Sequence, residues 1–244
     1  MNNPTENYER DNEAQIISLF TEYLREEAHR LSTDFHDFAL GSQDVELGAD
    51  WLYHADSRFL IIEYKASSDG FRRESSKPRR EQLCILLAKQ ARFRAAHRKC
   101  HYLAWSTGDS LQINIYEDQV CNALVFPQSC PKPKTPATSN LMDGAEFASR
   151  ILARGSKFGL PLDEFETYAE WLMIESSGSR DGSIQLIARN RSQPGFRMMR
   201  FDSLRDFDAW FKETKENAPG SGQFRPDAPD ADPDEKPGRP RFGG

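Results

Sequence analysis

The stretch GADWLYHADSRFLIIEYKA, from Gly48 to Ala66, decides the predicted fold. Residues 50–54 and 58–66 are rich in aromatic and branched side chains, and the Ala-Asp-Ser segment between them is typical of a tight turn, so the stretch predicts two strands of a hairpin. In the second strand, side chains alternate between two faces, and both faces are apolar until Glu63 and Lys65 share one of them. Such a strand is predicted to be covered on both sides, in the middle of a sheet.

Three polar residues of this hairpin predict a metal site. Burying an unpaired carboxylate or ammonium group costs several kcal/mol, so Glu63 and Lys65 must face each other, a metal ion or a solvated cleft. Asp50 begins the first strand, and a short hairpin returns it beside Glu63. Two carboxylates next to a lysine suit Mg²⁺, which binds hard oxygen ligands, lowers the pKa of a bound water and neutralises phosphate charge. A same-strand salt bridge for Glu63 and Lys65, and a simple turn role for Asp50, are the alternatives.

The elements around the hairpin predict an α/β domain with a mixed central sheet flanked by helices. Residues 1–11 are predicted to be disordered, and the polar, basic segment 67–80 is predicted to be a mobile loop. The other expected elements are a helix over 13–31 capped by Asn12, a helix over 78–98, and strands over 101–105 and 111–116.

The C-terminal part is predicted to be a separate unit. The segment 127–140 is rich in Pro, Ser and Thr, which is typical of a linker between a domain over 1–126 and a smaller α+β region over 141–217. The role of that region is open between an extension of the phosphate-binding surface by the arginines of its hairpin, dimerisation and docking of a protein partner. Residues 218–244 are rich in Pro, Gly and Asp and are predicted to be a disordered tail. The elements expected in the region are helices over 143–154, 162–176 and 203–215, and a hairpin of 183–189 with 196–201.

The spacing of Asp50, Glu63 and Lys65, written D-x12-E-x-K, resembles the PD-(D/E)xK nuclease superfamily. The resemblance covers about residues 12–116 and implies a restriction-endonuclease-like core, in which a helix, three strands, a helix and a strand follow one another. It departs from the superfamily's name at Ala49, which stands where that name has proline. By this resemblance, Asp50 and Glu63 bind the metal together with the backbone carbonyl of Tyr64, and Lys65 positions the attacking water.

The resemblance also implies two further catalytic residues. Many members place a glutamate near the metal, in the first turn of the opening helix, and Glu13 matches this place better than Glu22. A favourable charge at a helix N-terminus is the alternative for Glu13. Some members carry a glutamine in the helix after the lysine, which Gln82 matches better than Gln90. An ordinary surface position is the alternative for Gln82.

A concentrated positive charge follows the hairpin. Residues 65–99 hold 11 Lys and Arg against 3 Asp and Glu, whereas residues 1–63 hold 4 against 14. Such a segment is an electrostatic footprint for a polyanion, although a solvated basic helix gives the same pattern. Beside the expected metal site it predicts contacts with nucleic-acid phosphates. The nuclease resemblance favours DNA over RNA. The expected contact residues are Arg72, Arg73, Lys77, Arg79, Arg80, Lys89 and Arg92.

Composition limits the class of protein. The chain has 244 residues, a formal net charge of −6 and 38% hydrophobic residues, which is enough for one large domain with a core. No run approaches the roughly 18 apolar residues of a membrane span, and the polar N-terminus lacks a secretory pattern, so a cytoplasmic location without membrane contact is predicted. The four cysteines have no metal-ligand spacing and are predicted to be reduced, with Cys84 as a small core residue.

These features together predict a Mg²⁺-dependent phosphodiester hydrolase, with Mn²⁺ able to substitute. The expected reaction is endonucleolytic hydrolysis of DNA by an activated water, in bacterial defence, repair or a mobile element. Cutting both strands requires two such sites, and hence a homodimer or a partner. The alternative is a catalytically idle nuclease-like module that binds nucleic acid or a partner protein.

Overall fold

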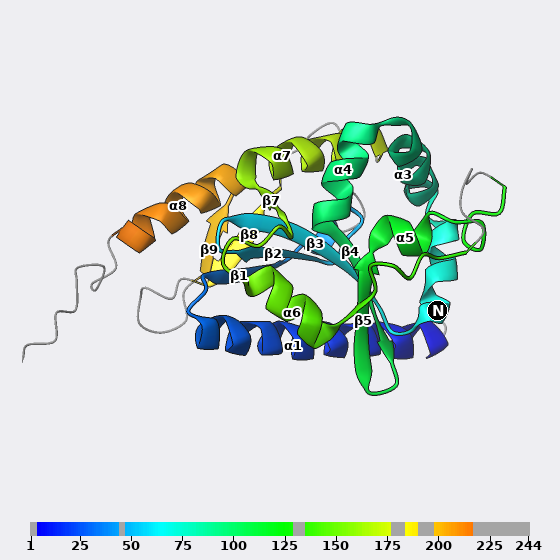
Figure 1. The fold of residues 1–244 in the computed structure, drawn as a ribbon, viewed down its shortest axis with the longest axis horizontal. Coiled ribbons are helices and arrows are strands. Elements are labelled where there is room, and N and C mark those ends of the chain that lie inside the picture. The colour runs from blue at the N-terminus through cyan, green and yellow to red at the C-terminus, as the bar shows by residue number, and fades with distance from the viewer. Residues whose placement is uncertain (1–3, 44–46, 129–134, 177–183, 190–197, 217–244) are drawn as a thin grey trace, which may run out of the picture.

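The computed structural model describes residues 4–43, 47–128, 135–176, 184–189 and 198–216. Its centre is a mixed β-sheet, and helices cover both faces of that sheet (Figure 1). The predicted α/β class, with a mixed central sheet flanked by helices, is confirmed. Among the described helices, none combines the length and the apolar character that crossing a bilayer requires.

The sheet is built around the hairpin of β2 (Trp51–Ala55) and β3 (Arg58–Lys65). Trp51 pairs with Ile62, and Asp56 turns the chain with a φ of +57°. Aspartate is one of the few residues that adopts this left-handed conformation readily. The predicted hairpin is therefore confirmed, and β3 is buried from its second residue onward, as a central strand must be.

The other strands extend the sheet on both sides of this hairpin. β1 pairs antiparallel with β2, whereas β4 runs parallel to β3, β5 and β6 follow β4, and β7 pairs with the start of β3. β1 was not among the predicted strands, because His36 and Asp37 interrupt its apolar pattern at the edge of the sheet. The bounds are β1 (Phe35–Ala39), β4 (His101–Thr107), β5 (Ser110–Ile115), β6 (Met142–Asp143) and β7 (Leu160–Pro161).

Helices α1 (Pro4–Leu31) and α6 (Gly144–Leu152) lie together on one face of the sheet (Figure 1). The prediction that the first helix begins after Asn12 is wrong, because α1 extends back to Pro4. Proline is tolerated in the first turn of a helix, where its missing N–H has no intrahelical partner. Residues 1–11, expected to be disordered, are helical from Pro4 onward.

The opposite face is covered by α3 (Pro78–Lys89), α4 (Ala91–Cys100), α5 (Tyr116–Val120) and α7 (Leu162–Trp171) (Figure 1). The single helix predicted over 78–98 is therefore two helices. The break lies at Gln90, whose φ of −116° and ψ of 84° are not helical. The side-chain oxygen of Gln90 accepts a hydrogen bond from the indole N–H of Trp171 at 3.0 Å, so the break is fixed by a contact with α7.

The segment predicted as a mobile basic loop is ordered. Residues Ser68–Ser76 form a 3-10 helix, η2, in which Phe71 and Glu74 are buried. The ring of Phe71 meets that of Trp105 in β4 edge to face, with centroids 5.0 Å apart. This aromatic contact holds a segment of polar composition against the core.

Residues on both sides of the expected linker 127–140 share one sheet and one core. β6 pairs with β5, and β7 pairs with β3. Phe147 of α6 packs against Phe20 of α1, with ring centroids 6.4 Å apart. The backbone carbonyl of Ala137 accepts a hydrogen bond from the side chain of Asn114 at 2.8 Å. The later segments thus complete the sheet that the first part of the chain begins.

The C-terminal elements follow the predicted order. They are the π-helix η3 (Leu172–Ser176), the hairpin of β8 (Leu186–Arg189) and β9 (Met198–Phe201), and α8 (Leu204–Glu216). The hydroxyl of Ser203 accepts a hydrogen bond from the N–H of Asp206 at 3.1 Å, which caps the N-terminus of α8. The predicted tail 218–244 lies outside the described residues.

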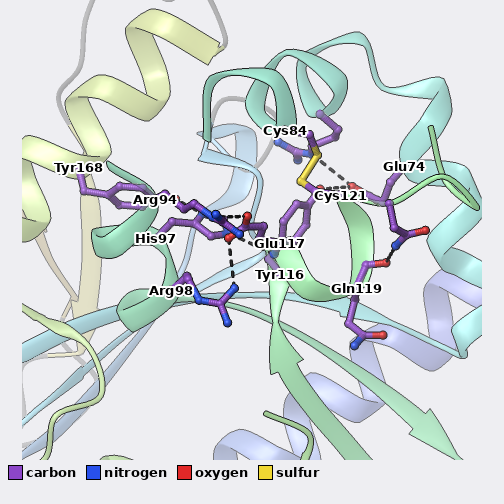
Figure 2. Close-up of a disulfide and its surroundings, with 12 residues drawn as sticks. Glu74, Cys84, Arg94, His97, Arg98, Tyr116, Glu117, Gln119, Cys121 and Tyr168 are labelled. Carbon is purple, nitrogen blue, oxygen red and sulfur yellow. Dashed lines mark hydrogen bonds and ion pairs between the residues drawn. A yellow bond between two sulfur atoms is a disulfide. The ribbon is translucent and has the colours of Figure 1, made fainter. Parts of the chain in front are cut away.

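Cys84 of α3 and Cys121, which follows α5, form a disulfide with Cα atoms 5.3 Å apart (Figure 2). The prediction that these cysteines are reduced is wrong, because folding brings together two residues whose separation of 37 positions gave no sign of pairing. Cys84 is buried, as expected. Cys100 is a buried free thiol, and Cys130 lies outside the described residues.

Candidate functional site

The hairpin brings together the three residues of the D-x12-E-x-K pattern. Asp50 enters β2 beside the end of β3, where its backbone N–H donates to the carbonyl of Ile62 at 3.0 Å. Its carboxylate Oδ2 accepts a hydrogen bond from the backbone N–H of Tyr64 at 2.6 Å. Tyr64 lies between Glu63 and Lys65 in β3. The side chains of Glu63 and Lys65 share one face of the strand, and that of Tyr64 lies on the opposite face. The aspartate, the glutamate and the lysine therefore occupy the same end of the hairpin.

The carboxyl groups of Asp50 and Glu63 differ in their pKa. Burial and the nearby negative charge of Glu63 raise the pKa of Asp50 to about 8. Burial would also raise the pKa of Glu63, but the positive charges of Lys65 and Lys77 outweigh it and lower this pKa to about 2. At neutral pH, the protein alone therefore holds an ionised Glu63 beside a mostly protonated Asp50.

Lys65 is buried, with 6% of its surface exposed, and it is charged. Its ammonium group donates to a carboxylate oxygen of Glu63 and, at 3.0 Å, to the carbonyl of Tyr64, and it lies 3.3 Å from Oε1 of Glu74. Burial would lower the pKa of Lys65, but the negative charges of Glu63 and Glu74 outweigh it and raise this pKa. Lys65 therefore acts as a cation in this arrangement and not as a proton acceptor.

Glu74 of η2 joins the cluster, although its place was not predicted from the sequence. Its side chain is fully buried, with 0% exposed. Oε1 of Glu74 lies 2.9 Å from Nζ of Lys77, while Oε2 accepts hydrogen bonds from the hydroxyl of Tyr116 at 2.8 Å and from Nε of Arg80 at 3.3 Å. The sequence signal was weak, because Glu74 is simply one of three acidic residues in the basic segment 65–99.

The two further residues that the resemblance implied have different positions. Oε1 of Glu13 accepts a hydrogen bond from the backbone N–H of Ala66 at 3.2 Å and lies 3.9 Å from Arg73, so this residue reaches the end of β3. It does so from the third turn of α1 and not from the first. Gln82 is exposed on α3, whose buried face includes Leu83, and the structure does not bring it into the cluster.

The oxygen donors at this end of the hairpin fit a hard divalent cation. Asp50 and Glu63 offer carboxylates and Tyr64 offers a backbone carbonyl, which are ligand types that Mg²⁺ and Mn²⁺ bind. A divalent cation would also offset the repulsion that contributes to the raised pKa of Asp50. Within the described ranges, no cluster of three or more His, Cys, Asp or Glu side chains is arranged as a metal site.

The basic residues predicted to contact nucleic acid divide into two groups. Arg80 is 4% exposed and pairs with Glu74, so the structure places it in the buried cluster and not on the surface where a phosphate contact was expected. Lys77 is partly exposed and lies 3.1 Å from Glu63, so it belongs to the buried cluster as much as to the surface. The exposed or partly exposed residues of the set are Arg72, Arg73, Arg79, Lys89 and Arg92.

A chain of hydrogen bonds supports the segment that leads into β2. The backbone N–H of Glu117 donates to Nε2 of His97 at 3.2 Å, so Nδ1 of His97 carries the proton and donates to the hydroxyl of Tyr168 at 2.7 Å. Tyr168 donates in turn to Nδ1 of His101 at 2.8 Å, and Nε2 of His101 donates to the carbonyl of Gly48 at 3.0 Å. Burial lowers the pKa of both histidines, so both rings are neutral and act as structural links.

Comparison with known proteins gives no match: no protein-family model, no curated protein and no solved structure matches the chain. The fold and the site by themselves define an α/β protein with a mixed central sheet and a charged cluster at the end of its central strand. Function is therefore inferred from the chemistry of this cluster.

Proposed function

We propose that this protein is a metal-dependent nuclease that hydrolyses phosphodiester bonds, with DNA as its substrate. The observation that carries the proposal is the convergence of Asp50, Glu63 and Lys65 at one end of the central hairpin. The carboxylate of Asp50 is hydrogen-bonded at 2.6 Å to the residue between the other two.

The residues of the site divide the reaction between them. When bound, Mg²⁺ or Mn²⁺ supplies a water of lowered pKa and neutralises charge on the phosphate. Asp50 and Glu63 would hold the ion with the carbonyl of Tyr64, and the ammonium of Lys65 would orient the attacking water and stabilise the negative charge of the transition state. Because neighbouring carboxylates raise the pKa of Lys65, this residue contributes positive charge and does not abstract a proton.

The order of elements supports the same proposal. α1, the strands β1, β2 and β3, the helices α3 and α4, and strand β4 follow one another along the chain. This order agrees with the helix, three-strand, helix, strand plan that the PD-(D/E)xK resemblance implies, with α3 and α4 together in the place of its second helix. The two carboxylates and the lysine lie on β2 and β3 or at their ends, which is where that plan places them.

Exposed cations near the site support a polyanionic substrate. Arg72 and Arg73 lie on η2, which begins three residues after Lys65, and Lys89 and Arg92 lie farther along α3 and α4. Contacts of this kind bind phosphates without reading bases, and they weaken as salt concentration rises. The preference for DNA over RNA rests on the resemblance alone.

Cleavage assays on supercoiled plasmid, linear duplex, single-stranded DNA and RNA test the proposal, each with Mg²⁺, Mn²⁺ or EDTA. We expect the wild type to cut DNA with either metal and not in EDTA, and Glu63→Gln and Lys65→Met to slow cutting by on the order of a hundredfold or more. Glu117→Gln is the matched control, because Glu117 is also a buried carboxylate, 9% exposed, but pairs with Arg94 and Arg98. Cutting that survives in both site variants would reveal a contaminant or a different site.

One observation favours the idle binding module as the second candidate. The carboxylates of Glu63 and Glu74 are paired with Lys65, Lys77 and Arg80, so protein groups alone balance the charge of this cluster. Such a module would bind a fluorescent DNA duplex equally well in EDTA and in Mg²⁺, and it would cut none of the four substrates. Binding and cleavage measured on the same protein sample separate the two functions.

A further inference from the structure

We propose that Glu74 is a positioning residue for Lys65, which holds the Lys65 ammonium away from the metal ligands when an ion binds. This inference rests on the proposed metal site. The observation that supports it is the set of contacts of the Lys65 ammonium group, which binds Glu63 and the carbonyl of Tyr64 and also lies beside Glu74. The first two of these acceptors are also donors expected for the ion.

Lys65 and a divalent cation compete for the same oxygen atoms. The ammonium donates to Oε1 of Glu63 and to the carbonyl of Tyr64, and two cations on those atoms would repel each other strongly in a buried site. The ion therefore binds well only if the ammonium moves to another acceptor. Oε1 of Glu74, 3.3 Å from Nζ of Lys65, is a carboxylate oxygen placed to receive it.

Glu74 is anchored so that it can receive the ammonium without moving. The hydroxyl of Tyr116 and Nε of Arg80 bind its Oε2, at 2.8 and 3.3 Å. Arg80 belongs to α3 and Tyr116 opens α5, and the disulfide of Cys84 with Cys121 joins α3 to the end of α5 (Figure 2). One carboxylate oxygen is thus fixed by the surrounding elements, and the other faces the ammonium groups.

Mn²⁺ binding, measured from the free-ion signal in electron paramagnetic resonance, tests this role without a nuclease assay. In Glu74→Gln the side-chain oxygen can still accept from Tyr116 and Arg80, but the amide nitrogen cannot accept from Lys65. The ammonium then stays on Glu63, and we expect the Kd for Mn²⁺ to rise about tenfold, the scale of one charge-assisted hydrogen bond. In the Lys65→Met background the Lys65 ammonium is absent and only that of Lys77 remains beside Glu63 and Glu74, so the same substitution should change Kd by less than about threefold.

The matched control is Glu117→Gln, which should bind Mn²⁺ as the wild type does. A wild-type Kd in Glu74→Gln would overturn the inference. An equal rise of Kd with and without Lys65 would also overturn it, because a simple loss of negative charge acts in both backgrounds. If Glu74→Gln does not fold, Glu74→Asp tests the inference instead, because it keeps the negative charge but shortens the side chain by one methylene. The Kd of Glu74→Asp for Mn²⁺ should rise only where Lys65 is present.

The nuclease proposal and this inference fail in different ways. Mn²⁺ binding by the wild type without cleavage of any substrate would contradict the nuclease proposal. The Kd values of the Glu74 variants would still test the positioning role. DNA cleavage by the wild type together with an unchanged Kd in Glu74→Gln would contradict the positioning role alone. Absence of Mn²⁺ binding by the wild type would contradict both.

Discussion

The guanidinium of Arg80 lies directly against Gly48: a Cβ atom placed on Gly48 would be 2.2 Å from Nη1 of Arg80. Gly48 also has a φ of +71°, which lies in the left-handed region. Because Arg80 is buried and pairs with Glu74, this contact connects the segment leading into Asp50 with the charged cluster around Lys65. The two halves of the proposed site are therefore packed as one unit.

Replacement of Gly48 should destabilise the protein more than the same replacement of Gly41. Both glycines have positive φ, so left-handed strain of about 1–2 kcal/mol is common to Gly48→Ala and Gly41→Ala. A Cβ at Gly41 has nothing within 4 Å, whereas at Gly48 it overlaps the buried guanidinium. We expect Gly48→Ala to lose about 2 kcal/mol more of unfolding free energy in urea denaturation. Equal losses would contradict the packing contact with Arg80.

The disulfide of Cys84 with Cys121 should contribute about 4 kcal/mol to the free energy of unfolding. It joins residues 37 positions apart, and the loss of chain entropy in the unfolded state gives this magnitude for such a loop. Urea denaturation with and without dithiothreitol measures the effect. Cys100→Ala is the control, because Cys100 is a free thiol and its replacement should leave the response to reductant intact. A midpoint that reductant does not change would contradict the prediction.

Ionisation of Asp50 should make the metal-free protein less stable as pH rises from about 4 to about 8. Its pKa of about 8 in the folded protein exceeds the ordinary 3.8, so the folded state binds the proton more tightly and loses that advantage across this window. The loss is a few kcal/mol, since one pKa unit corresponds to about 1.4 kcal/mol. The pKa of Glu63 is lowered from 4.5 to about 2, so protonation of Glu63 destabilises the fold as pH falls from about 4.5 to about 2, and above about pH 5 its effect is constant.

Asp50→Asn isolates this effect, because the amide does not ionise. The difference in unfolding free energy between Asp50→Asn and the wild type, measured by urea denaturation in EDTA at several pH values, should shift in favour of the variant as pH rises. A difference that stays constant from about pH 5 to about pH 8 would show that Asp50 has an ordinary pKa in the folded protein.

The central hairpin was predictable because its signals are local. Apolar residues on both faces of 58–66, a turn at Ala55-Asp56-Ser57 and an E-x-K pattern at the strand end lie within a few positions of one another. The same is true of the Ser203 cap of α8, whose partner Asp206 is three residues away. Local patterns fix local geometry, and the relative position of Asp50 and Glu63 follows from the register of one hairpin.

The rest of the site was not predictable because it depends on contacts that only the fold creates. Arg80 has the same charge as Arg79, and the pattern does not show which of the two is buried against Glu74. Glu74 itself lies in a segment of polar composition that one aromatic contact orders. Cys84 meets Cys121 only because the fold brings the end of α5 to α3.

Lys89 and Arg92 should each contribute a phosphate contact if α3 and α4 face the DNA. In the Glu63→Gln background, which should not cut, Lys89→Ala and Arg92→Ala should weaken binding of any duplex and lower the slope of log K against log salt by about 0.9 each. Fluorescence anisotropy from about 50 to about 200 mM salt measures both quantities. Arg150→Ala is the control, because Arg150 is an exposed cation on α6, which covers the opposite face of the sheet (Figure 1). An unchanged slope in the first two variants, or an equal fall in the control, would contradict a DNA path along α3 and α4.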